Sequence, residues 1–172
     1  VYKRQQHIRS QAEGTVLEGR IDYGKKIFEV EISNSGPKSY ETATVMKMPA
    51  SFAEFSDALQ KARIKDGSFC KNELTCIHYN GLTHAMIGWN ANLYDLNLFA
   101  QRLASLTEEQ KKGMDALLKI KQNHRVAPIP LNQLINLTYN TDICCFAPRV
   151  SNHEELGAFL YANEMLSNEA MA

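Results

Sequence analysis

The 172-residue chain has no excess of charge of either sign and no long hydrophobic run. Its 19 acidic residues balance its 19 basic ones, which gives a formal net charge of zero. A large phosphate-binding face needs clustered Lys and Arg, and a protein that mimics duplex DNA needs roughly one negative charge per 1.7 Å of duplex axis. A membrane-spanning helix needs about 20 apolar residues. The composition therefore argues against a basic nucleic-acid-binding domain, an acidic DNA mimic and a membrane protein.

Glycine-rich and acidic motifs are also missing. Gly81 and Gly88 lie in no strand-to-helix turn of the dinucleotide-binding or P-loop type. The acidic residues are scattered, so no cluster indicates magnesium and no pair of carboxylates stands out for acid–base chemistry. The sequence therefore offers no catalytic motif, and we expect no cofactor. The hydrophobic content of 44% and the charged content of 22% are typical of a folded domain.

The chain has few cysteines, namely Cys70, Cys76, Cys144 and Cys145, and it contains no secretory signal. Cys144 and Cys145 are adjacent, which is a poor arrangement for a mutual disulfide because the two Cα atoms are only one peptide apart. We therefore expect free thiols in the reducing cytoplasm.

Cys70, Cys76, His78 and His84 are four zinc-ligand types within 15 residues. Zinc knuckles usually pair ligands across two to four intervening residues, whereas five residues separate the two cysteines here. The spacing therefore favours a buried cysteine beside surface histidines over a zinc site. On a strand, Cys76 and His78 would point to the same face. A nucleophilic Cys–His pair would need the fold to supply a base and an orienting group, and no local motif selects such a pair.

The first half of the chain predicts a small antiparallel sheet. We expect residues 1–14 to be a disordered or artefactual leader and residues 15–91 to form a β-β-β-α-(β) subdomain. The expected strands are 15–22 and 27–33, which would form a hairpin around a positive-φ Gly24, followed by 40–48 and 69–79. In the last strand, Leu74 and Cys76 are expected on one face and Ile77 on the other.

Capping residues mark the expected helices. Ser51 and Glu54 form a capping box that opens a helix over 51–63. Its expected apolar stripe consists of Phe52, Phe55, Leu59 and Ala62. Residues 92–172 predict a helical subdomain whose helices begin after Asn92, at the Thr107–Gln110 capping box, at Pro130 and at the Ser151–Glu154 capping box. The chain is therefore expected to be an α+β protein, with an N-terminal antiparallel sheet of three to four strands and one helix, followed by a mostly helical half.

Five residues are candidates for binding a protein partner: Trp89, Tyr139, Asp142, Glu154 and Glu155. Trp89 lies in an expected irregular segment over 80–92. An aromatic residue in a loop can anchor an interface, although such a loop more often packs on its own core. The three acidic residues and Tyr139 would suit a basic partner surface. Acidic residues near helix N-termini more often serve as caps and helix-dipole partners.

Four segments of the chain, taken together and in order, resemble a known family. They are 46–55 (Met-Lys-Met-Pro-Ala-Ser-Phe-Ala-Glu-Phe), 94–103 (Tyr-Asp-Leu-Asn-Leu-Phe-Ala-Gln-Arg-Leu), 128–145 from Pro128 to Cys145, and 152–160 (Asn-His-Glu-Glu-Leu-Gly-Ala-Phe-Leu). The sequence is similar in these segments to antirestriction ArdA-like proteins of conjugative and prophage elements from gut anaerobes. None of the four segments is a catalytic motif.

This resemblance implies a non-enzymatic anti-defence protein in the cytoplasm of a bacterial host. The expected partner is a DNA-targeting nuclease, either a CRISPR Cas9–guide RNA complex or a type I restriction enzyme. ArdA proper is a strongly acidic DNA mimic, whereas this chain is neutral. Anti-CRISPR proteins that inhibit Cas9 occur in the same genetic setting, so the neutral charge favours Cas9. Direct nucleic-acid binding is not expected of the isolated chain, but it is compatible with a nuclease complex.

Two alternatives remain open. The chain could be a regulatory protein-binding module of a conjugative element, which would give invading DNA no protection. It could also be a small cysteine or zinc enzyme, which would depend on Cys76 or His78.

Overall fold

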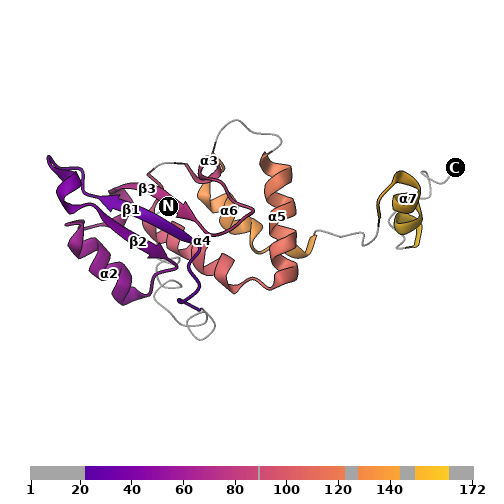
Figure 1. Cartoon of the computed structure of the whole chain (residues 1–172), viewed down its shortest axis with the longest axis horizontal. Coiled ribbons are helices and arrows are strands. Elements are labelled where there is room, and N and C mark those ends of the chain that lie inside the picture. Colours follow the sequence, from indigo (N-terminus) through magenta and orange to yellow (C-terminus); the bar gives the residue numbers. More distant parts are fainter. Residues whose placement is uncertain (1–21, 89, 123–127, 144–149, 163–172) are drawn as a thin grey trace, which may run out of the picture.

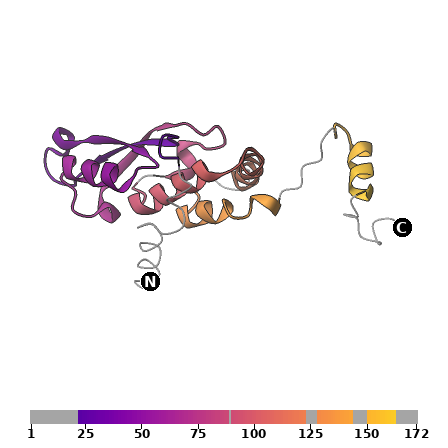
Figure 2. The same cartoon turned by 90° about the horizontal axis from the view of Figure 1, so that it is seen from below.

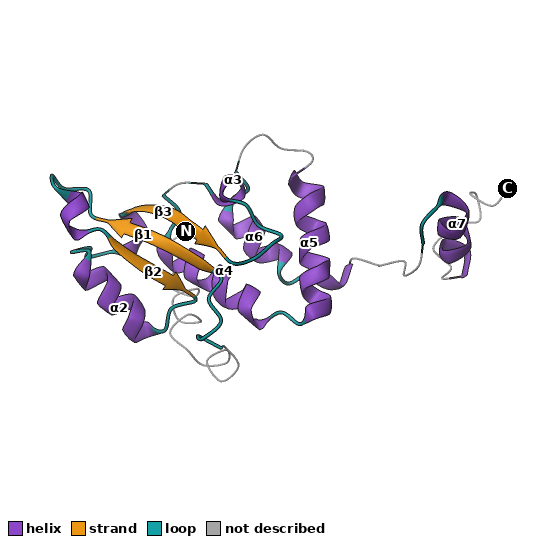
Figure 3. Ribbon diagram, viewed as in Figure 1, coloured by secondary structure: helices purple, strands orange, loops and turns teal. Residues whose placement is uncertain are grey.

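The computed structural model describes residues 22–88, 90–122, 128–143 and 150–162. They form an α+β architecture with a strand-rich N-terminal side and a mostly helical remainder (Figures 1 and 3), which confirms the expected fold class. The strands are β1 (Phe28–Ser33), β2 (Thr44–Met48) and β3 (Lys71–Ile77), and the α-helices are α2 (Phe52–Lys61), α3 (His84–Ile87), α4 (Leu93–Ser105), α5 (Glu108–Gln122), α6 (Leu131–Leu137) and α7 (His153–Ala162). Short 3₁₀ helices are η1 (Ser39–Thr42), η2 (Gly67–Phe69) and η3 (Thr141–Ile143). The expected leader over 1–14 lies outside the described residues.

β1 is the central strand of the sheet, which corrects the predicted hairpin. One edge of β1 pairs with β2 and the other with β3, both antiparallel. Because a strand has only two edges, β1 has no edge left for the predicted hairpin partner. Of the expected strand 15–22, residues 15–21 lie outside the described residues. Gly24 does not have a left-handed φ either. Its N–H instead donates to the Asp22 carboxylate at 2.9 Å, inside a turn closed by the Lys25 N–H and the Asp22 carbonyl.

The strand predicted over 40–48 is shorter than expected. It begins at Thr44 because residues 39–42 form η1, where Tyr40 is 75% exposed. The Asn34 side chain donates to the Thr42 hydroxyl at 3.1 Å and to the Ala62 carbonyl at 3.3 Å. The Thr42 hydroxyl donates to the Ser39 carbonyl, and the Thr44 hydroxyl donates to the Thr42 carbonyl, both at 3.2 Å. These local bonds give the backbone near Thr42 an alternative to strand pairing.

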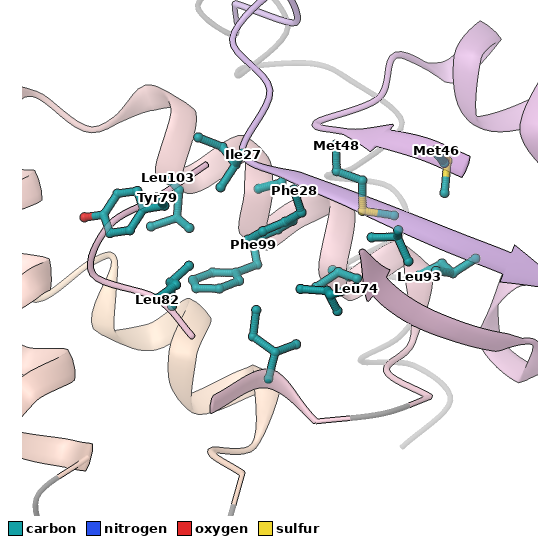
Figure 4. Close-up of a cluster of buried hydrophobic side chains, with 14 of the residues drawn as sticks. Ile27, Phe28, Met46, Met48, Leu74, Tyr79, Leu82, Leu93, Phe99 and Leu103 are labelled. Carbon is teal, nitrogen blue, oxygen red and sulfur yellow. The ribbon is translucent and has the colours of Figure 1, made fainter. Parts of the chain in front are cut away.

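The hydrophobic core lies between the inner face of the sheet and the helices that cover it (Figure 4). Phe28 of β1 stacks on Phe99 of α4, with ring centroids 5.9 Å apart. Met48 from β2 and Leu74 from β3 join the same cluster. Fully burying a Phe, Met or Leu side chain contributes about 1.5–3 kcal/mol. The strand-rich and helical halves therefore share one core, and α4 is the element that joins them.

A β-bulge in β3 reverses the predicted facing of Cys76. Glu29 pairs with Cys76 while the next residue, Val30, pairs with Leu74, so Thr75 has no partner in the register. The Thr75 hydroxyl donates to the Glu29 carbonyl at 3.1 Å. Since the extra residue shifts the alternation by one, Leu74 and Ile77 face the core and Cys76 faces the open side of the sheet with Glu29.

The capping boxes Ser51–Glu54 and Thr107–Gln110 form as predicted, and the Asn92 side chain caps α4. The stripe of α2 differs at one end, because Phe52 is 82% exposed and Ala58 is buried in its place. Phe52 is the first residue of α2, ahead of the turns that contact the core. Phe55 does pack inward, with its ring 5.1 Å from that of Tyr94.

Two helix starts are shifted by one residue. Pro130 precedes α6 as its cap instead of being its first residue, and its carbonyl accepts from the Gln133 and Leu134 N–H groups. α7 is capped by Asn152 instead of Ser151, because the Asn152 side chain accepts from the Glu155 N–H at 2.8 Å. The segment expected to be irregular contains the short helix α3. Among the described residues, no helix has the length and apolar content to cross a membrane.

Candidate functional site

The predicted binding residues lie on two parts of the structure. Tyr139 follows α6 and Asp142 lies on η3, whereas Glu154 and Glu155 lie in the first turn of α7. Figures 1 and 2 draw α7 apart from the body formed by the sheet and α2–α6. Trp89 lies outside the described residues. The structure therefore does not bring Tyr139 and Asp142 together with the two glutamates of α7.

Tyr139 stacks on a residue that the sequence did not single out. Its ring lies 3.9 Å from the guanidinium carbon of Arg102 on α4, and Tyr139 is 57% exposed. Arg102 also donates to the hydroxyl and the carbonyl of Thr138, both at 3.3 Å. Arginine and tyrosine are enriched in protein interfaces. We call Arg102 and Tyr139 the Arg–Tyr platform. Asp142 is exposed on the neighbouring η3.

The Arg–Tyr platform was missed because its two residues are far apart in the sequence. Arg102 lies 36 positions from Thr138, the residue that its guanidinium holds. The only local signal is a basic residue in the last turn of α4, where a cation favours the helix dipole. That signal indicates a helix end and does not identify a partner.

Replacing Arg102 by Lys is expected to lower the free energy of unfolding by about 1 kcal/mol, because an ammonium cannot make the two guanidinium bonds to Thr138 and also stack flat on Tyr139. Tyr139→Phe keeps the ring and is expected to stay within about 0.5 kcal/mol of wild type. Urea unfolding followed by circular dichroism measures both. Equal stability of Arg102→Lys and wild type would show that the guanidinium geometry contributes nothing.

Helix α7 begins with an elaborate cap. The Glu155 carboxylate accepts from the Ser151 N–H at 2.7 Å and from the Ser151 hydroxyl at 2.8 Å. These bonds lower the pKa of Glu155, the backbone N–H contributing most. Glu155 therefore has a structural role in starting the helix, whereas Glu154 is exposed on its surface.

Helix α7 has no apolar side chain that the described part of the chain fully buries. None of the ten residues of α7 is buried, and Leu156 and Tyr161 are 39% and 69% exposed. Leu156 and Leu160 lie four positions apart and so share one face, which we call the α7 stripe. Isolated helices shorter than about 12 residues are marginal in water, and most helices gain their stability by burying such a stripe. The α7 stripe is therefore the clearest candidate for a partner-binding surface.

The four potential zinc ligands do not converge. Cys70 is buried, and burial raises the pKa of its thiol. His84 is exposed on α3, while Cys76 and His78 lie side by side at the end of β3. Within the described ranges, no group of three or more Cys, His, Asp or Glu side chains could hold a metal ion. The described residues therefore offer no zinc site built from this set.

Comparison with known proteins finds no relative: no protein-family model matches the chain, and neither a curated protein nor a solved structure matches it.

Proposed function

We propose that this chain is a non-enzymatic anti-defence protein that binds and inhibits a bacterial DNA-targeting nuclease, with α7 as its docking helix. The observation that carries the proposal is the α7 stripe, in which Leu156 and Leu160 remain outside the core of the described chain. Amphipathic helices recognise protein grooves through apolar side chains spaced three and four residues apart. The leucines of α7 have this spacing, and no residue of the helix is buried among the described residues.

The charge of α7 favours a nucleic-acid-handling partner. Glu154 and Glu155 lie in its first turn, and residues 150–162 contain no Lys or Arg. RNA-guided nucleases hold their nucleic acid in positively charged channels. An acidic and apolar helix fits the protein surface at the edge of such a channel.

The neutral charge of the whole chain favours Cas9 as the target over a type I restriction enzyme. Replacing a duplex along its full length requires roughly one negative charge per 1.7 Å, and a chain of net charge zero does not supply that. Steric or conformational blocking of a Cas9–guide RNA complex through protein contacts needs no such charge.

The four segments that resemble antirestriction proteins fall into two kinds. The segments 46–55 and 94–103 contain core residues such as Met48 and Phe99. The segment 128–145 also contains core residues, Ile129 and Leu134, besides exposed Tyr139, whereas 152–160 contains most of α7. We infer that the first three segments build the core and that the segment 152–160, which belongs to a helix without buried residues, provides the partner contact.

The experiment that tests the proposal is plating of a targeted phage on three matched strains that express the chain: one with Cas9 and a guide, one with a type I restriction system, and one with neither. We expect the wild-type chain to restore plating on the Cas9 strain only. Leu156→Glu with Leu160→Glu is expected to abolish the rescue. If the partner buries both leucines at about 1.5 kcal/mol each, their loss weakens binding about 100-fold.

The matched control is Ala158→Glu with Ala162→Glu. It adds the same charge at the same spacing, but on the opposite side of α7. We expect it to keep the rescue, and both variants to unfold in urea like the wild type, because α7 buries no residue. Rescue on the restriction strain alone would change the target. No rescue on either defended strain, with soluble protein present, would favour the regulatory-module alternative.

A further inference from the structure

A row of polar side chains crosses the open face of the sheet. In the register of the strands, Glu29 of β1 stands opposite Lys47 of β2 on one side and Cys76 of β3 on the other. The Lys47 ammonium lies 3.4 Å from the Glu29 carboxylate. His78 follows two residues after Cys76, and it completes a compact group of a thiol, an imidazole and a carboxylate.

The imidazole of His78 lies between the other two groups. Its Nδ1 is 3.9 Å from Cys76 Sγ, and its Nε2 is 3.5 Å from Glu29 Oε1. When Nε2 carries the proton that faces Glu29, Nδ1 presents its lone pair to the thiol. Such an order of nucleophile, base and orienting carboxylate is the arrangement that activates nucleophilic side chains.

The bulge at Thr75 is what makes this arrangement possible. With regular alternation, Cys76 would share the core-facing side of Leu74 and would lie away from Glu29. The extra residue instead places Cys76 opposite Glu29 on the open face. His78 is 45% exposed and Cys76 is half-buried, so a small molecule in solvent can reach the sulfur.

We propose that Cys76 is a reactive thiol, activated by His78 and Glu29, which reacts with low-molecular-weight disulfides of the glutathione type. His78 Nδ1 accepts the thiol proton, and the Cys76 thiolate attacks one sulfur of the disulfide. The S–S bond of the reagent breaks and a mixed disulfide forms on Cys76. The departing thiolate takes the proton from His78 and leaves as a free thiol, so one thiol and one disulfide are consumed and one of each is formed.

Cys70 provides an internal comparison. It is 7% exposed, its Sγ lies 3.7 Å from the Gly67 carbonyl, and burial raises the pKa of its thiol. A buried thiol without an adjacent base is expected to be inert. The proposal is also independent of α7, because the site lies wholly on the three strands and the residue that follows β3.

The test is the rate at which each cysteine of the intact folded chain forms a mixed disulfide with oxidised glutathione at pH 7.5, read by peptide mass spectrometry. We expect Cys76 to react at least about tenfold faster than Cys70. His78→Gln and Glu29→Gln are expected to slow Cys76, the first by about tenfold. His84→Gln removes another exposed histidine outside the group and is expected to change nothing.

A rate at Cys76 that is the same in His78→Gln as in wild type would overturn the proposal. Circular dichroism checks that the variants fold. If they do not fold, the wild type alone decides. Cys76 must then react faster in the folded chain than in the urea-unfolded chain. Cys70 must react more slowly in the folded chain than in the unfolded one. A folded Cys76 that is slower than the unfolded one would also overturn the proposal.

Discussion

Replacing Gly113 by Ala is expected to destabilise the fold by about 2 kcal/mol, although the same change would stabilise an isolated helix by roughly 1 kcal/mol. Gly113 lies in the middle of α5, where η3 packs against it. A Cβ at this position would overlap the Thr141 carbonyl oxygen and would lie 3.1 Å from the carbonyl carbon. Backbone atoms cannot turn aside as a flexible side chain can, so α5 and η3 would have to separate. Urea unfolding measures the loss.

Gly157 provides the matched control for this prediction. It also lies within a helix, but nothing lies within 4 Å of where its Cβ would stand. Gly157→Ala is expected to leave the unfolding of the body unchanged and to raise the helix content slightly. Equal stability of Gly113→Ala and wild type would mean that η3 does not press on α5 as the structure indicates.

Asn97→Ala is expected to cost about 2–4 kcal/mol, because it removes two hydrogen bonds to buried backbone. The Asn97 side chain accepts from the Ala50 N–H at 2.7 Å and donates to the Ala50 carbonyl at 3.0 Å. Ala50 is 1% exposed and lies between β2 and α2. Asn97 therefore holds the strand-to-helix connection on α4, and without it both backbone groups of Ala50 would lose this partner.

Two further variants make this second prediction specific. Asn97→Asp keeps the size of the side chain and the acceptor for the Ala50 N–H, but it places an oxygen against the Ala50 carbonyl. We expect it to lose at least about 1 kcal/mol. Asn136→Ala, on the exposed side of α6, is expected to stay within about 0.5 kcal/mol of wild type. In urea unfolding we expect Asn136→Ala to be the most stable variant, Asn97→Asp the next and Asn97→Ala the least stable. If Asn97→Ala were about as stable as wild type, the two hydrogen bonds between Asn97 and Ala50 would not stabilise the fold as expected.

The candidate surfaces were predictable to different degrees. The acidic residues of α7 and the apolar spacing of the same helix can be read from the sequence, and Tyr139 was found in the same way. Arg102 was not found, because its contact with Tyr139 exists only once α4 and the end of α6 are packed together. The Cys76–His78 proximity follows from strand alternation, whereas Glu29 enters the group only through pairing across the sheet.

The sequence by itself determined the α+β class and, to within one residue, the starts of α2 and α4–α7, but not the short helix α3. Cap bonds join groups about three positions apart, as between Thr107 and Gln110, so local sequence contains all the information they need. Tertiary structure alone decided that β1 is central, that Thr75 bulges and that Gly113 must lack a side chain. Asn97 and Ala50 likewise lie 47 positions apart, so their contact depends on packing that no short window of sequence contains.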